Sequence, residues 1–96
     1  EEVSIYCLKN NIKLTLLNVP HHKDYRKRII DFQLEEEEAI FKNDIKKIGN
    51  VIDYDYENSI TECKKCFTDP VHTNDSINLI MAKEIFRDSL VIGKKL

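Results

Sequence analysis

Glycine, proline and cysteine are scarce in this sequence, and each shortage excludes a class of protein. The 96 residues include two Gly and two Pro, which excludes collagen-like chains and flexible linkers. The cysteines are odd in number (Cys7, Cys63 and Cys66), which argues against a secreted disulfide framework. With 42% hydrophobic residues, the chain is expected to form at most one globular domain with a modest core.

Long hydrophobic runs and an excess of charge of one sign are also missing. No run of about 18 apolar residues occurs, so we expect no membrane-spanning segment, and no signal peptide is visible. Fifteen basic residues against 17 acidic ones leave a net charge of −2, which gives no attraction to nucleic acid. A short basic cluster at 23–28 contains Asp24 and is interpreted as a solvated helix face. We therefore expect no nucleic-acid or membrane partner, and the localisation stays unknown.

Hydrophobic periodicity predicts a helix, a strand and two further helices in the first half of the chain. Apolar residues at helical spacing predict a helix over 3–9. The nearly continuous apolar run at 12–19 predicts a strand buried on both faces, as in a parallel sheet. Residues 21–47 predict two helices, the second beginning with the acidic run 35–38 at its positive dipole end. Gly49 is expected at the C′ position of that helix.

The second half predicts one strand, one long loop and a final helix. A short strand is expected at 50–54, followed by a loop over 55–73 that has no convincing period. Asn74 or Asp75 can cap a helix that continues to about Leu90. Apolar residues occupy most of the circumference of this helix, so we expect protein to cover most of it.

Together these elements predict the fold class α/β, as a three-layer α/β/α fragment with parallel strands. Only two strands are expected, which is too few for doubly buried strands to form a complete sheet. The chain also begins at Glu1 rather than at Met. We therefore expect residues 1–96 to be a single partial α/β domain.

Asp69 and His72 are the residues whose spacing indicates acid–base chemistry. A carboxylate three positions from an imidazole can accept a hydrogen bond from one ring nitrogen, which fixes the tautomer and leaves the other nitrogen as a general base. This is the orienting acid and the base of a catalytic triad without its nucleophile. The alternative is a surface loop in which Asp69 starts an Asx-type turn with Pro70.

The segment 67–90 resembles the last conserved block of the SGNH (GDSL-type) hydrolases, in which an Asp-x-x-His pair precedes a C-terminal helix. Residues 13–20 (KLTLLNVP) and 50–53 (NVID) are similar to strands that precede this block in the family. The resemblance implies the C-terminal half of a flavodoxin-like hydrolase that acts on a small-molecule ester without a cofactor. It also implies that Asp69 is the orienting acid and His72 the catalytic base.

The chain departs from this family because the Gly-Asp-Ser block that carries the nucleophilic serine does not occur in it. The family also has a Gly and an Asn that complete the oxyanion hole, whereas the only glycines here are Gly49 and Gly93. We therefore expect an esterase or acyl hydrolase whose N-terminal half, with the nucleophile, is missing here. The alternative, from another class, is a small non-catalytic α/β interaction module. Such a module would self-associate through the open edges of its short sheet and form a homo-oligomer.

Cys63 and Cys66, spaced as Cys-Lys-Lys-Cys, have three interpretations. With His72 they would give three ligands to zinc, but a closed structural site needs four, so we expect no metal. A redox motif would be expected between a strand and the start of a helix, whereas these residues lie in the predicted loop. We expect a passive pair of cysteines or a disulfide.

Two further pairs of residues have alternative interpretations. His21 and His22 follow the first strand and are expected either on the same rim as His72 or, as we favour, in the exposed first turn of a helix. Tyr54 and Tyr56 either line the mouth of a substrate site or pack at the end of the second strand.

Overall fold

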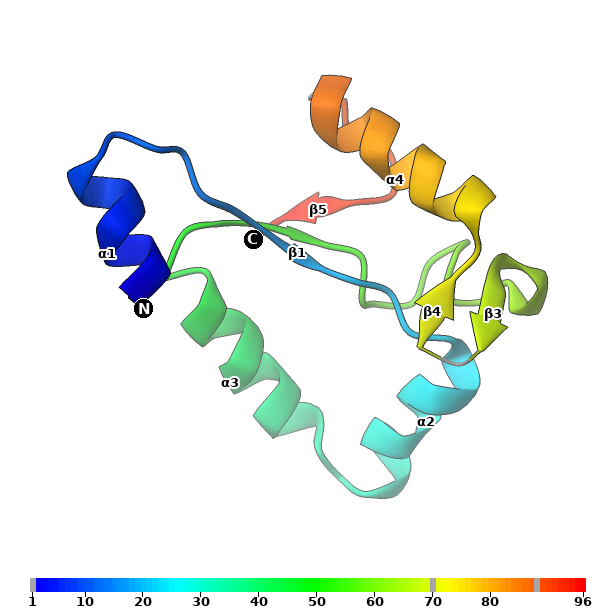
Figure 1. The fold of residues 1–96 in the computed structure, drawn as a ribbon. Coiled ribbons are helices and arrows are strands. Elements are labelled where there is room, and N and C mark those ends of the chain that lie inside the picture. Colours follow the sequence, from blue (N-terminus) through cyan, green and yellow to red (C-terminus); the bar gives the residue numbers. More distant parts are fainter. Residues whose placement is uncertain (1, 70, 88) are drawn as a thin grey trace.

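The computed structural model describes residues 2–69, 71–87 and 89–96, which form a mixed α/β fold (Figure 1). In chain order the elements are α1 (Glu2–Lys9), β1 (Thr15–Asn18), α2 (Lys23–Asp31), α3 (Glu35–Ile45), β2 (Asn50–Asp53), the 3₁₀ turn η1 (Lys64–Cys66), β3 (Phe67–Asp69), β4 (His72–Thr73), α4 (Asp75–Arg87) and β5 (Lys94–Lys95). None of the helices in the described part of the chain is long and apolar enough to cross a membrane.

The described strands form a three-stranded sheet and a separate hairpin. The order in the sheet is β1-β2-β5, and β3 pairs with β4. β1 and β2 are parallel, with Thr15 opposite Asn50 and Asn18 opposite Asp53, and α2 and α3 form the crossover between them. The parallel pair was predicted, but the expectation of parallel strands alone is wrong, because β5 runs antiparallel to β2.

The core lies between β2 and α4. Ile52 and Tyr54 pack there with Ile60 and with Met81 of α4. Successive residues of a strand point to opposite faces of a sheet, so Asp53 points away from this core. Lys42 of α3 reaches Asp53 on that opposite face, with its ammonium nitrogen 2.9 Å from the carboxylate.

β1 is not buried on both faces as its sequence predicts. Its residues alternate between exposed and half-buried, and Leu17 is 43% exposed. Val19, directly after the strand, is 44% exposed. The reason is that β1 lies at the edge of the sheet. The core formed with α4 covers Ile52 and Tyr54, in and directly after β2, and does not cover β1.

The final helix also differs from its prediction. Asn74 caps it, since its side-chain oxygen accepts the N–H of Ile77 at 3.0 Å, as expected. The helix ends at Arg87 rather than near Leu90. Its buried described residues are Met81 and Glu84, because one face alone meets the core. The expectation that protein covers most of its circumference is therefore wrong. Ile77 and Ile85 are half-buried against the core, whereas three other apolar residues are exposed (Leu79, Ile80 and Phe86).

Two local predictions are also corrected. Gly49 does not adopt the positive φ of a C′ glycine, and α3 ends earlier, at Ile45. A Cβ at Gly49 would lie 3.3 Å from the carbonyl oxygen of Leu14, so this glycine allows a close approach of two chain segments. The segment 55–73, predicted as a loop, contains η1, β3 and β4. These elements are too short to give a hydrophobic period.

Glu84 holds the C-terminal segment through its buried carboxylate. The carboxylate accepts hydrogen bonds from the hydroxyl of Tyr54 and from the backbone N–H of Gly93, both at 3.1 Å. The N–H groups of Val91 and Ile92 also donate to it, at 3.3 Å. Burial, followed by this contact with Glu84, raises the pKa of Tyr54. The hydroxyl therefore remains a donor to Glu84.

Replacing Glu84 by Gln is expected to lower the free energy of unfolding by about 2 kcal/mol, because hydrogen bonds to a charged carboxylate are stronger than those to an amide. Urea denaturation followed by circular dichroism measures the change. Glu57→Gln, at an exposed position, is the control and should change the stability by less than about 0.5 kcal/mol. Equal losses in the two variants would contradict this role of Glu84.

Candidate functional site

The β3–β4 hairpin brings Asp69 and His72 together. The two residues are opposite each other in the hairpin, and the Nδ1 atom of His72 lies 2.9 Å from Oδ1 and 2.8 Å from Oδ2 of Asp69. The N–H of Val71 donates to Oδ1 of Asp69 at 2.9 Å. This second contact is the Asx-type turn of the alternative interpretation, although Pro70 itself lies outside the described residues. The turn and the carboxylate–imidazole pair exist together, so they are not alternatives.

The electrostatics of this pair favour an ionised Asp69 carboxylate. The N–H of Val71, and after it the imidazole of His72, lower the pKa of Asp69. A carboxylate at Nδ1 places the ring proton there and leaves the lone pair on Nε2. Within the described residues, Nε2 of His72 makes no hydrogen bond. The side chains are 50% exposed for Asp69 and 72% exposed for His72, so Nε2 is accessible to a reacting group.

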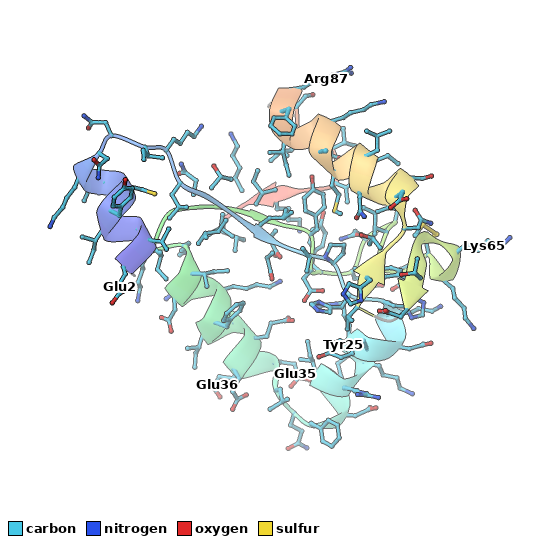
Figure 2. The ribbon with its side chains drawn as sticks, in the orientation of Figure 1. Glu2, Tyr25, Glu35, Glu36, Lys65 and Arg87 are labelled. Atoms are coloured by element: carbon cyan, nitrogen blue, oxygen red, sulfur yellow. A yellow bond between two sulfur atoms is a disulfide. The ribbon has the colours of Figure 1, made fainter. Side chains whose placement is uncertain are left out.

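The hairpin is fixed at its other end by Asn74. The side-chain amide of Asn74 donates to the carbonyl of Lys65 at 2.9 Å, and its backbone N–H donates to the carbonyl of Cys66 at 2.8 Å. Asn74 is also the cap of α4. Figure 2 shows the Lys65 side chain extending away from the molecule at this turn. One residue therefore ties η1, the hairpin and α4 to each other.

Cys63 and Cys66 form a disulfide across η1. Of the two expected alternatives, a disulfide or a passive pair of cysteines, the disulfide is confirmed. Both sulfur atoms are used in this bond, so the alternative zinc site with His72 has no free thiolates in this structure. Among the described residues there is no group of three His, Cys, Asp or Glu side chains that could hold a metal.

A second polar group, which we name the strand-end cluster, consists of His21, Arg26, Lys42, Asp53 and Asp55. It follows the carboxyl ends of β1 and β2. The backbone N–H of His21 donates to Asp55 at 3.0 Å, and Nδ1 of His21 lies 3.1 Å from the other carboxylate oxygen. Arg26 lies 3.0 Å from the Asp55 carboxylate, and Lys42 donates to the Asp55 carbonyl at 2.6 Å. The cluster thus ties α2 and α3 to the strand ends.

The cationic side chains of this cluster change the pKa of its carboxylate Asp55. Burial raises the pKa of Asp55, but His21 and Arg26 together lower it by more, so the net pKa lies below its ordinary value. Sequence interpretation missed Arg26, assigned to a solvated face, and Lys42. The pair Asp53 and Asp55 could have indicated these two cations, because carboxylates at the end of a buried parallel strand need cationic partners.

The two adjacent histidines are not in an exposed helical turn, so the favoured prediction for them is wrong. His22 is 4% exposed, and its Nδ1 accepts the N–H of Asp24 at 3.2 Å as the cap of α2. Its ring meets the ring of Phe67 edge-on, with centroids 5.5 Å apart. His22, Phe67 and Asp69 line one pocket of about 190 Å³. His22 therefore shares a pocket with the acid of the hairpin, but His72 does not line it, so a common rim for the histidines stays a prediction.

Tyr54 packs in the interior and Tyr56 packs beside the C-terminal segment, and neither lines the pocket next to Asp69. Tyr54 is fully buried and donates to Glu84. The hydroxyl of half-buried Tyr56 donates to the carbonyl of Ile92. Neither tyrosine lines the pocket beside Asp69, so their mouth interpretation is wrong.

No family model, curated protein or solved structure matches this chain.

Acid is expected to weaken the strand-end cluster. The pKa of Asp55 is lower in the folded chain than in the unfolded one, so its contribution to stability is present above about pH 4 and is lost as the pH falls further. Urea denaturation at pH 7 and pH 3 should therefore show a smaller loss in Asp55→Asn than in the wild-type chain. Asp31→Asn, at an exposed position, should behave as wild type. An unchanged pH dependence in Asp55→Asn would contradict the ion pairs.

Proposed function

We propose that this chain supplies the acid–base pair of an SGNH-type ester hydrolase. His72 is the general base and Asp69 is the acid that orients it. The observation that carries the proposal is the 2.8 Å contact between Nδ1 of His72 and the Asp69 carboxylate, at the entry to α4. The resemblance of this segment to the last conserved block of those hydrolases agrees with it.

The arrangement of helices and strands supports the fold that such a hydrolase would have. The proposed fold is a three-layer α/β/α fragment, flavodoxin-like, in which β1 and β2 are two parallel strands of a larger sheet. It is supported by the parallel register, by the core with Met81 of α4 on one face and by Lys42 of α3 on the other. The nucleophilic serine then comes from residues outside these 96, in an N-terminal half.

In the proposed reaction the Asp69 carboxylate accepts a hydrogen bond from Nδ1–H of His72 and holds the ring in that tautomer. The Nε2 lone pair takes the hydroxyl proton of the serine while its oxygen attacks the ester carbonyl carbon. Asp69 stabilises the resulting imidazolium, which then gives its proton to the departing alcohol. A water molecule, activated in the same way, releases the acid and restores the serine. The pocket of about 190 Å³ beside Asp69 fits a small substrate group.

The experiment uses the full reading frame that contains these residues. A fluorophosphonate probe, which labels activated serines, should label the protein, and a chromogenic acetate ester should be hydrolysed. His72→Asn and Asp69→Asn should each reduce the rate of hydrolysis by about 10³-fold or more. Asp31→Asn is the control and should retain the full rate. Labelling that is absent from the wild type, or undiminished in His72→Asn, would refute the proposal.

A second candidate function is an interaction module, which the open edge of β1 favours. The carbonyls of Leu14 and Asn18 accept hydrogen bonds from the segment that contains β2. Alternate residues direct their backbone groups to alternate sides, so those of Thr15 and Leu17 face the open edge. The exposed apolar side chains of Leu17 and Val19 lie beside these groups. Such an edge pairs readily with another strand.

If the chain is such a module, sedimentation equilibrium of the 96 residues should show a dimer. Leu17→Lys should dissociate it, because a charge beside an edge strand opposes pairing. Leu8→Lys, at an exposed position of α1, is the control and should leave the dimer intact. A monomer at concentrations of about 100 μM would contradict self-association.

A further inference from the structure

The Cys63–Cys66 disulfide lies between a buried anchor and the hairpin that carries Asp69. Upstream, Ile60 and Thr61 are buried, and the N–H of Cys63 donates to the carbonyl of Ile60 at 3.0 Å. Downstream, β3 begins at Phe67, immediately after Cys66. The disulfide closes the turn between these two points, so it sets the direction in which β3 leaves the core.

The same turn also holds the second strand of the hairpin. Its carbonyls at Lys65 and Cys66 accept both hydrogen bonds from Asn74, the residue that follows β4. β3 therefore continues directly from the turn along the chain, and β4 is held to the turn by the hydrogen bonds of Asn74. A ribbon of three residues paired with two is not stable alone in water. The contact between Asp69 and His72 therefore depends on the shape of this turn.

The disulfide is also placed for reaction with a thiol. Both cysteines are half-buried, and the residues between them, Lys64 and Lys65, are exposed. Positive charge next to a disulfide stabilises the thiolate that leaves when the bond is attacked. Cys7, the remaining cysteine, is buried in α1 and is not part of this bond.

We propose that Cys63 and Cys66 are a redox-active pair whose disulfide form holds Asp69 and His72 together. The effect of this disulfide on catalysis rests on the proposed hydrolase function. The reductant is a dithiol. One of its thiolates attacks a sulfur of the pair, the sulfur–sulfur bond breaks, and the other cysteine leaves as a thiolate. The second thiol of the reductant resolves the mixed disulfide. Two electrons and two protons pass to the pair, and the reductant becomes a disulfide.

Reduction removes the covalent closure of the turn. The carbonyls of Lys65 and Cys66 are then no longer held in the positions that Asn74 needs, and β4 loses its anchor. His72 separates from Asp69, and the imidazole changes from the Nδ1–H tautomer to the Nε2–H form that free histidine prefers. In that form Nε2 cannot accept a proton from a nucleophile.

The test is long-range ¹⁵N–¹H NMR of the His72 ring in the 96-residue chain, at about pH 8, which is above the ordinary range of histidine titration. Oxidised chain should show the Nδ1–H tautomer, and chain reduced with dithiothreitol should show a shift to Nε2–H. Reduction should also raise the pKa of Asp69, measured from its carboxyl ¹³C shift, toward the ordinary value. Amide signals of β1 and β2 should not move.

Two variants serve as controls. Cys63→Ser with Cys66→Ser should give the reduced spectrum with or without dithiothreitol. Cys7→Ser should keep the full difference between the two states. The same tautomer in both states, three free thiols instead of one in the oxidised chain, or loss of the β1 and β2 signals on reduction would each overturn the proposal. These results do not depend on hydrolysis, whereas failure of the fluorophosphonate experiment would refute the hydrolase alone.

Discussion

The contact of Ile60 and Met81 with β2 is the constraint on which the positions of the other parts depend. Met81 fixes α4 over Ile52 and Tyr54, and Ile60 fixes the chain that leads into η1. The β3–β4 hairpin lies between these two anchors in the sequence and makes no strand pairing with the main sheet. Its place is therefore determined by its two ends, through the disulfide turn on one side and the Asn74 cap on the other. Hydrophobic burial determines where the ends are, and polar contacts determine how the hairpin is oriented between them.

Asp55 contacts the imidazole of His21, and Asp69 contacts that of His72. The two contacts differ in whether the imidazole is accessible to a substrate. Asp55 is shared between His21 and Arg26, and the His21 side chain is 24% exposed within a group of paired charges. Asp69 accepts from the His72 ring and from the backbone N–H of Val71, and the His72 ring reaches solvent. A general base must meet its substrate with a free lone pair. This favours His72 as the base and a structural role for His21, which joins α2 to the sheet.

The sequence predicted the features that depend on neighbouring residues and missed those that depend on distant ones. The helices, the parallel pair β1–β2, the Asn74 cap and the proximity of Asp69 and His72 follow from local spacing and from capping chemistry. The exposure of β1 does not, because hydrophobicity alone does not indicate which strand lies at the edge. The hairpin was hidden for a similar reason, since Asn74 holds it to Lys65 and Cys66, nine and eight residues earlier. The burial of His22 depends on Phe67, much further along the chain.

The open edge of β1 connects the two candidate functions, because each requires a strand to pair with Leu17. They require opposite directions. A strand from an N-terminal half that reaches β1 through a helical crossover runs parallel to it, since parallel strands of α/β domains are connected in that way. A second copy related by a two-fold axis perpendicular to the sheet brings its own β1 antiparallel. The direction of the strand next to Leu17 therefore distinguishes a divided hydrolase sheet from a self-associating module.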